Sequence, residues 1–270
     1  MTGRKLASLI AGLAALAVLP NTAHALQYGS WHQQNGCATW LTQRGDGIPP
    51  SNVYIAGCES GADKKLYQGQ IAGGGGTGWL ELPGLTAVQI SAWDSGSIWA
   101  RRSNGTVHYR TASGWSGPVS FGGGNACASY IAAAGSNTVY ALGCETTPDK
   151  SIWWRNTSGN WIQLPGAGKQ IGFAGTWSSL YVVTSAFRSW RWTGTTWELL
   201  PGYTFQLSTG RNDAYYAQMF DGWIYKWENQ NWQDYFPPTP LQGYPTKFFT
   251  RQWATDTLNR IYVWDYGIFP

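Results

Sequence analysis

The feature that most constrains the fold of this chain is a recurring motif, Trp-x-x-Leu-Pro-Gly. Its three full copies begin at Trp79, Trp161 and Trp197. Degenerate copies begin at Trp115 and Trp232, and Trp31 is a sixth candidate. Successive tryptophans are separated by 35 to 48 residues. A recurrence at this period indicates a repeat architecture, and each interval matches one four-stranded propeller blade.

Each repeat also has a regular interior. About twenty residues after the tryptophan comes an apolar–aromatic pair such as Ile98-Trp99, and after a polar turn comes a second pair such as Val107-His108. The turn between them contains Asn104-Gly105, a strong hairpin signal. Each repeat is therefore predicted to be a meander of four short antiparallel strands, a to d. The tryptophan lies on strand d, and Leu-Pro-Gly is expected to end that strand before the chain crosses to the next repeat.

A lone meander cannot bury both faces, so the repeats must pack on one another, and a closed ring does this while protecting the strand edges. Six anchor tryptophans predict an all-β, six-bladed β-propeller. The last repeat, after Trp232, runs out of chain at Pro270. We therefore expect the N-terminal strand around Trp31 to complete the last blade. The alternative is a five-bladed ring with an N-terminal extension.

The first 25 residues have the features of a secretory signal peptide. Arg4 and Lys5 precede an apolar run of 13 residues, Leu6 to Val18, and Ala23-His24-Ala25 offers a cleavage site. We expect cleavage there, a secreted or periplasmic protein, and a single propeller domain over residues 26–270. No later apolar segment is long enough to predict a transmembrane span.

Four cysteines in an exported chain predict disulfides. The residues around Cys37 resemble those around Cys127, and the residues around Cys58 resemble those around Cys144. The matching places fall on predicted strands a and b, and opposed residues on such strands are close enough for a bridge. We therefore predict the pairs Cys37–Cys58 and Cys127–Cys144, one inside each of two blades. A zinc site is the alternative, but the chain has no Cys-x-x-Cys pattern.

Composition argues against several classes of function. The chain has 18 basic residues, and removal of Arg4 and Lys5 with the signal peptide leaves 16 basic against 14 acidic residues, a net charge of +2. The basic residues form no cluster of the kind that binds nucleic acid. No nucleophile elbow or His-Glu-x-x-His motif is present. We expect no cofactor, no metal and no catalytic residues. The 18 tryptophans exceed what six anchors require, and aromatic rings near loops suit sugar binding.

One repeat resembles a known family over most of its length. The residues that carry the resemblance are Trp79 to Gly84, Val88 to Ser91, Ile98 to Ala100, Tyr109-Arg110 and Trp115. They resemble the tectonin repeat, and the resemblance extends over most of residues 31–264, although the cysteine pairs depart from the usual pattern. It implies a six-bladed propeller and, since several such proteins are secreted lectins, binding of surface glycans or lipopolysaccharide.

Charged side chains gather in the predicted b–c turns, on the face that also carries the Leu-Pro-Gly crossings. The candidate ligand-binding residues there are Asp63, Lys64, Arg101, Arg102, Asp149, Lys150, Arg188, Asp221 and Trp223. We expect a lectin that recognises a glycan or lipopolysaccharide through these loops and through pockets between blades. The alternatives are a glycan-processing hydrolase, which needs a pair of carboxylates, and a protein-interaction propeller without sugar affinity. Solvated turns without a ligand are the simpler reading of the same charges.

Overall fold

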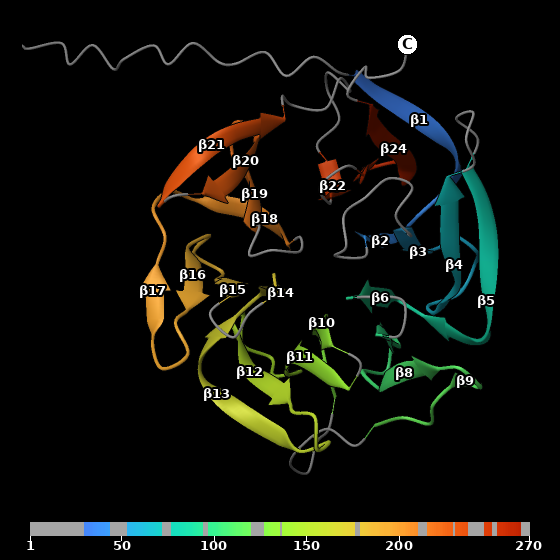
Figure 1. Cartoon of the computed structure of the whole chain (residues 1–270), viewed down its shortest axis with the longest axis horizontal. Helices are drawn as coiled ribbons and strands as arrows, with labels where there is room; N and C mark the ends of the chain where they lie inside the picture. The colour runs from blue at the N-terminus through green and yellow to red at the C-terminus, as the bar shows by residue number, and fades with distance from the viewer. Residues whose placement is uncertain are drawn as a thin grey trace, which may run out of the picture.

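The described part of the chain forms six four-stranded antiparallel sheets arranged around a central axis (Figure 1). The computed structural model describes residues 30–43, 53–71, 77–93, 97–119, 127–135, 137–175, 179–209, 215–228, 230–236, 246–249 and 253–265. No helix occurs in these ranges, and none of these residues belongs to a helical segment able to cross a bilayer. The chain is therefore a six-bladed β-propeller, as predicted, and the predicted signal peptide lies outside the described residues.

Every blade runs from strand a at the axis to strand d at the rim. Blade 1 is β2 (Trp40–Gln43), β3 (Val53–Ala56), β4 (Lys64–Ile71) and β5 (Thr77–Ala87). Blade 2 is β6 (Gln89–Ala92), β7 (Ile98–Arg101), β8 (Val107–Thr111) and β9 (Gly114–Trp115). Blade 3 is β10 (Tyr130–Gly135), β11 (Thr138–Leu142), β12 (Lys150–Arg155) and β13 (Trp161–Gly168).

The second half of the ring follows the same order. Blade 4 is β14 (Gln170–Phe173), β15 (Leu180–Val183), β16 (Ser189–Trp192) and β17 (Trp197–Leu199). Blade 5 is β18 (Thr204–Thr209), β19 (Tyr215–Met219), β20 (Ile224–Glu228) and β21 (Asn231–Phe236). Blade 6 is β22 (Thr246–Phe249), β23 (Trp253–Asp256), β24 (Arg260–Asp265) and β1 (Ser30–Cys37). Each anchor tryptophan lies on a strand d, as predicted.

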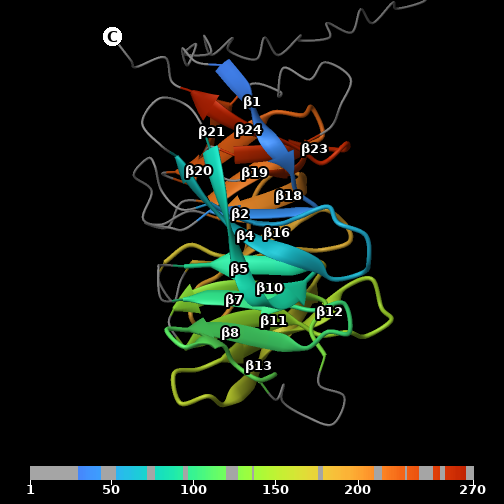
Figure 2. The same cartoon turned by 90° about the vertical axis from the view of Figure 1, so that its right-hand side faces the viewer.

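The N-terminal strand closes the ring. β1 pairs antiparallel with β24, from Ser30 opposite Asp265 to Cys37 opposite Arg260, and so supplies strand d of blade 6. From the side, β1 and β24 lie beyond blade 1 at the top of the molecule (Figure 2). The expected closure is confirmed. The C-terminal segment supplies three strands of blade 6, and β1 supplies the fourth.

The Leu-Pro-Gly segment does not always end strand d, which corrects the prediction. In β17 the strand stops at Leu199, but β5 and β13 continue beyond the motif. In β13, Leu164 pairs with Ile152 and Ala167 with Ser151, so Pro165 and Gly166 form a bulge. Gly166 has φ 93°, a conformation that glycine adopts at little cost. Because proline has no backbone N–H, its position in the bulge leaves no unpaired donor in the sheet.

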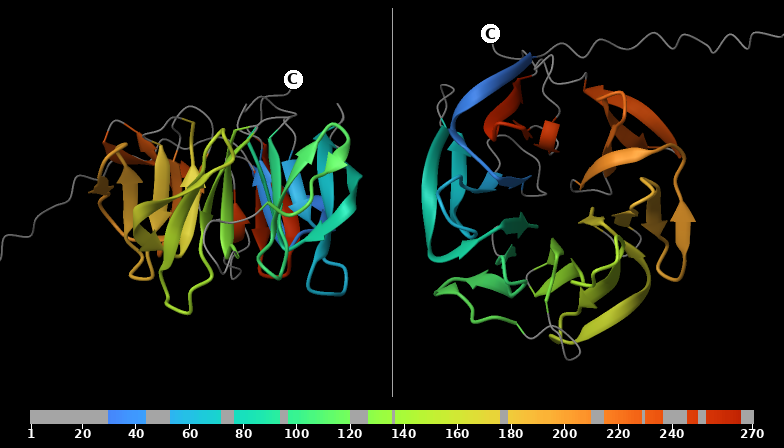
Figure 3. Two further views of the ribbon diagram at one scale, coloured as in Figure 1. Left: turned by 90° about the horizontal axis from the view of Figure 1, so that it is seen from below. Right: turned by 180° about the vertical axis from the view of Figure 1, so that it is seen from behind.

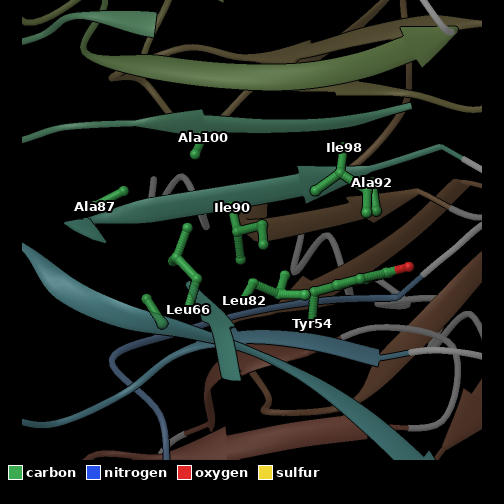
Figure 4. Close-up of a cluster of buried hydrophobic side chains, with 9 residues drawn as sticks. Tyr54, Leu66, Leu82, Ala87, Ile90, Ala92, Ile98 and Ala100 are labelled. Carbon is green, nitrogen blue, oxygen red and sulfur yellow. The ribbon is translucent and has the colours of Figure 1, made fainter. Parts of the chain in front are cut away.

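The hydrophobic core lies between blades rather than within one sheet. Figure 4 shows Tyr54, Leu66 and Leu82 of blade 1 facing Ile90 and Ile98 of blade 2. Trp99 and Val107 of blade 2 pack in the same way against Ile131 and Val139 of blade 3. Because each blade buries both of its faces against its neighbours, strand b of each blade is a nearly continuous run of apolar residues.

Both predicted disulfides are confirmed, but their places differ from the prediction. Cys37 ends β1 of blade 6, and Cys58 follows β3 of blade 1, with Cα atoms 5.9 Å apart. Cys127 precedes β10 and Cys144 follows β11, with Cα atoms 5.7 Å apart. The bridges therefore join crossings to b–c turns, and the first one links the closing blade to blade 1.

Candidate functional site

The b–c turns and the crossings from strand d to the next strand a lie on one face of the disc, because strands alternate in direction within each blade. We call it the crossing face. The pairing of Lys64, the first residue of β4, with Ala87, the last of β5, shows this arrangement. Figure 3 shows the strands running between this edge of the disc and the opposite one. All nine predicted site residues lie at or beside the b–c turns on this face.

Two of the predicted lysines stabilise their own turns. Lys64 Nζ donates to the carbonyl oxygens of Glu59 and Gly61, each at 2.5 Å. Lys150 Nζ donates to the carbonyl oxygens of Glu145 and Thr147 in the equivalent turn of blade 3. These contacts account for the positions of both lysine side chains, so neither lysine requires a ligand.

Two of the predicted aspartates join neighbouring blades. The carboxylate of Asp63 accepts hydrogen bonds from Arg102 Nε at 3.0 Å and from the Ser103 N–H at 2.6 Å. Asp149 occupies the equivalent place in blade 3 and accepts from the N–H and the hydroxyl of Ser185, at 2.6 and 2.9 Å. Asp63, Arg102 and Asp149 therefore hold adjacent b–c turns together.

Asp221 and Trp223 form the b–c turn of blade 5. Asp221 accepts from the Trp223 N–H at 2.9 Å and from the Tyr225 hydroxyl at 2.6 Å. The Trp223 side chain is only partly exposed. Both residues shape this turn.

Arg101 is the last residue of β7, beside the turn that carries Arg102. Its Nε donates to the side-chain oxygen of Gln89 at 3.1 Å, and its Nη1 reaches the Arg102 carbonyl oxygen only at 3.5 Å. It makes no ion pair within the described ranges. Burial lowers the pKa of Arg101, although the nearby Tyr130 and Asp63 oppose this effect.

Gln89, the hydrogen-bond partner of Arg101, lines the central channel. A cavity of about 60 Å³ is lined by the a strands of blades 1 to 5. The rings of Trp40 and Tyr130, from blades 1 and 3, meet there edge to face with centroids 5.1 Å apart. The lining side chains are apolar, aromatic, hydroxyl or amide groups, and none of those described is charged.

An aromatic patch lies over blades 4 and 5 on the crossing face. It consists of Phe187, Tyr203, Phe205 and Phe220. Tyr203, Phe205 and Phe220 are 55%, 43% and 62% exposed. These residues were not predicted from the sequence, in which the excess of tryptophan is the stronger aromatic signal. The available signal was the presence of large aromatic residues immediately after Pro201-Gly202 and in the turn before Gly222.

The backbone under the patch is held rigidly. Phe187 has φ 60°, which is rare for a bulky residue and is found most often at functional sites. The carbonyl oxygen of Phe187 accepts from the Thr204 N–H at 2.8 Å. The buried Thr204 hydroxyl accepts from Ser189 at 2.6 Å. These bonds fix the turn that carries Phe187 against the crossing that carries Tyr203 and Phe205.

Two cations border the patch. Lys169 Nζ lies 3.6 Å from the ring centroid of Phe187, and Arg188 Cζ lies 5.0 Å from that of Tyr203. Burial lowers the pKa of Lys169, and the charge of Asp149 opposes this effect. Neither cation forms an ion pair with another described residue. Arg188, one of the nine predicted residues, therefore contacts this patch directly.

Metal binding receives no support from the described ranges, in which His, Cys, Asp and Glu side chains form no cluster of three or more suited to an ion. The anchor tryptophans Trp79, Trp197 and Trp232 each donate their indole N–H to a carbonyl oxygen of the preceding blade. These three tryptophans therefore form contacts between neighbouring blades.

Comparison with known proteins shows the fold and nothing finer. Virginiamycin B lyase from Staphylococcus aureus is 16% identical with a TM-score of 0.51, and the match covers 83% of this chain and 78% of that one. YCF48 bound to D1 peptide is 14% identical with a TM-score of 0.52, and the match covers 89% and 98% of the two chains. No protein-family model matches the chain, and no curated protein matches it in sequence. Because the similar structures include a lyase and a peptide-bound protein, the shared propeller does not identify an activity.

Proposed function

We propose that this protein is a secreted carbohydrate-binding protein that recognises cell-surface glycans or lipopolysaccharide through the aromatic patch on the crossing face. The observation that carries the proposal is the exposure of Tyr203, Phe205 and Phe220 on one rigid surface. Aromatic faces provide a large contact area at low cost in conformational entropy, and they stack on the C–H surfaces of sugars.

The polar groups around the patch support the same function. Arg188 and Lys169 lie against aromatic rings and make no ion pair in the described part of the chain. Their remaining N–H groups are able to donate to sugar hydroxyls or to the acidic groups of a surface glycan. A hydrolase would need a pair of carboxylates, yet Asp63, Asp149 and Asp221 all hold turns. The aromatic surface therefore favours binding over hydrolysis.

The experiment is a glycan array, including lipopolysaccharides, probed with residues 26–270 and with single variants. We expect Phe220→Ala and Tyr203→Ala to weaken binding about tenfold, the effect of losing about 1.4 kcal/mol. Leu80→Ala is the control, because Leu80 is 56% exposed but lies on β5 of blade 1. No bound glycan, or equal binding by all variants, would contradict the proposal. Turnover of a bound glycan would instead favour the hydrolase.

A further inference from the structure

The position of Arg101 suggests a second ligand site, separate from the aromatic patch. A partly buried cation normally has a carboxylate partner, because an uncompensated buried charge is costly. Arg102 pairs with Asp63 at 3.0 Å, and Arg191 pairs with Glu198 at 2.6 Å. Arg101 has only one hydrogen bond of ordinary length, to the neutral amide of Gln89. Most of its five N–H donors are therefore available to another acceptor.

Gln89 fixes Arg101 at the mouth of the channel. The two residues are cross-strand partners on β6 and β7, and their side chains share one face of the sheet. The Gln89 amide donates to the Ile131 carbonyl oxygen at 2.9 Å and accepts from the Ile131 N–H at 3.0 Å, across the boundary with blade 3. Because Gln89 lines the cavity and is held at both ends, Arg101 has a defined position beside it.

The rest of the cavity has the chemistry of a sugar site. Trp40 and Tyr130 reach the mouth from blades on either side of Gln89. Deeper in the cavity, Thr42, Ser91, Ser208 and Thr209 contribute hydroxyl groups to the lining. A ligand that satisfies all these groups has one anionic group and a neutral, hydroxylated body.

We propose that the mouth of the central channel binds an acidic monosaccharide of the uronic acid class, with its carboxylate on Arg101 and its ring against Trp40 and Tyr130. The planar guanidinium suits a carboxylate, which it can bind through two parallel hydrogen bonds. This site shares no residue with the aromatic patch and does not depend on it. Its ligand is a single sugar unit rather than an extended glycan.

The test is calorimetric titration of residues 26–270 with sodium glucuronate, and with glucose, acetate and inorganic phosphate as separate controls. We expect glucuronate to bind roughly tenfold to hundredfold more tightly than glucose, as the loss of a charge-assisted hydrogen bond implies. Equal binding of glucose would overturn the role of Arg101. Equal binding of acetate or phosphate would overturn the assignment to an acidic sugar.

Variants separate this site from the patch and from a structural role of Arg101. Arg101→Gln should weaken glucuronate binding about tenfold or more, and Phe220→Ala should leave it unchanged. Arg101→Lys keeps the charge but loses the bidentate geometry, so its affinity should be intermediate; it provides the readout if Arg101→Gln does not fold. Unchanged affinity in the folded Arg101 variants, or no glucuronate binding by the wild type, would overturn the proposal whatever the glycan array shows.

Discussion

The indole Nε1 of Trp197 donates a hydrogen bond to the backbone carbonyl oxygen of Pro165 in the preceding blade, at 2.7 Å. Trp232 makes the same bond to Pro201 in the next pair of blades, at 2.8 Å. The motif that begins at Trp197 therefore supplies both the tryptophan donor for one boundary and the proline acceptor for the next. At these two boundaries the bond links the tryptophan of one motif to the proline of the preceding motif.

We predict that Trp197→Phe destabilises the protein by about 1 kcal/mol, the usual net contribution of one hydrogen bond. Phenylalanine keeps an aromatic ring but removes the donor to Pro165. Trp115→Phe is the matched control, because the Nε1 of this anchor is buried without a hydrogen-bond partner. Chemical denaturation should show a smaller loss for Trp115→Phe than for Trp197→Phe. Equal losses would mean that ring volume, rather than the hydrogen bond, matters at this boundary.

The glycine of the motif should also be intolerant of substitution. An alanine Cβ at Gly166 would lie 3.1 Å from Trp197 Nε1, on a backbone with φ 93°. Gly194 has a similar φ of 98° but no atom within 4 Å of the added Cβ. We expect both alanine variants to lose about 1 kcal/mol through backbone strain. Gly166→Ala should lose about 1 kcal/mol more through crowding, and thermal unfolding would measure the difference.

The sequence alone was sufficient to predict the features that repeat along the chain. Six tryptophans at regular intervals predicted six blades, and the matching surroundings of Cys37 and Cys127 predicted both disulfides. The bulge at Pro165-Gly166 was missed because proline and glycine are equally compatible with a strand end and with a bulge.

The contacts of the candidate site were not predictable in the same way. Asp63 meets Arg102 across 39 residues of sequence, and no local pattern links the two. The aromatic patch combines Phe187, Phe205 and Phe220 from three separate segments, and each residue alone has the character of an ordinary turn aromatic. Only the packing of blade 5 against blade 4 brings these segments onto one surface.

The contact between Asp149 and Ser185 should affect both stability and binding. Ser185 lies in the turn that carries Phe187, so Asp149→Ala should loosen the aromatic patch. We expect a loss of about 1 kcal/mol, faster hydrogen exchange at the Ser185 amide, and weaker glycan binding. Asp63→Ala removes the equivalent contact between blades 1 and 2, far from the patch. It should cost similar stability but leave glycan affinity unchanged; equal effects on affinity would indicate that the patch is not the site.

Acid should weaken the b–c turn of blade 1 through Glu59. Burial alone would raise the pKa of Glu59, but hydrogen bonds from Tyr67 and from backbone N–H groups lower it below its ordinary value of 4.5. A carboxyl group with a lower pKa in the folded state adds stability above its unfolded pKa and loses it as the pH falls through the folded value. Stability should therefore decline below about pH 4.5.

Glu59→Gln should flatten this acid limb, as measured by urea unfolding between about pH 3 and pH 6, where carboxyl groups titrate. The same hydrogen bond raises the pKa of Tyr67 to about 12, so Glu59→Gln should also shift the alkaline titration of one tyrosine to lower pH. Glu228→Gln is the control, because Glu228 pairs with Lys226 on an exposed part of β20. An unchanged acid limb in Glu59→Gln would show that other carboxyl groups control acid stability.

The two disulfides should contribute similarly to stability but differ in what they hold together. They join cysteines 21 and 17 residues apart, and loop closure in the unfolded chain predicts about 3 kcal/mol for each. Cys37–Cys58 joins the closing strand β1 to blade 1, whereas Cys127–Cys144 joins two segments at the entry to blade 3. Cys37→Ala/Cys58→Ala should therefore speed hydrogen exchange in β1 and β24, where the ring closes. Cys127→Ala/Cys144→Ala should lose comparable stability without this local opening. Equal protection of β24 in the two double variants would show that strand pairing alone keeps the ring closed.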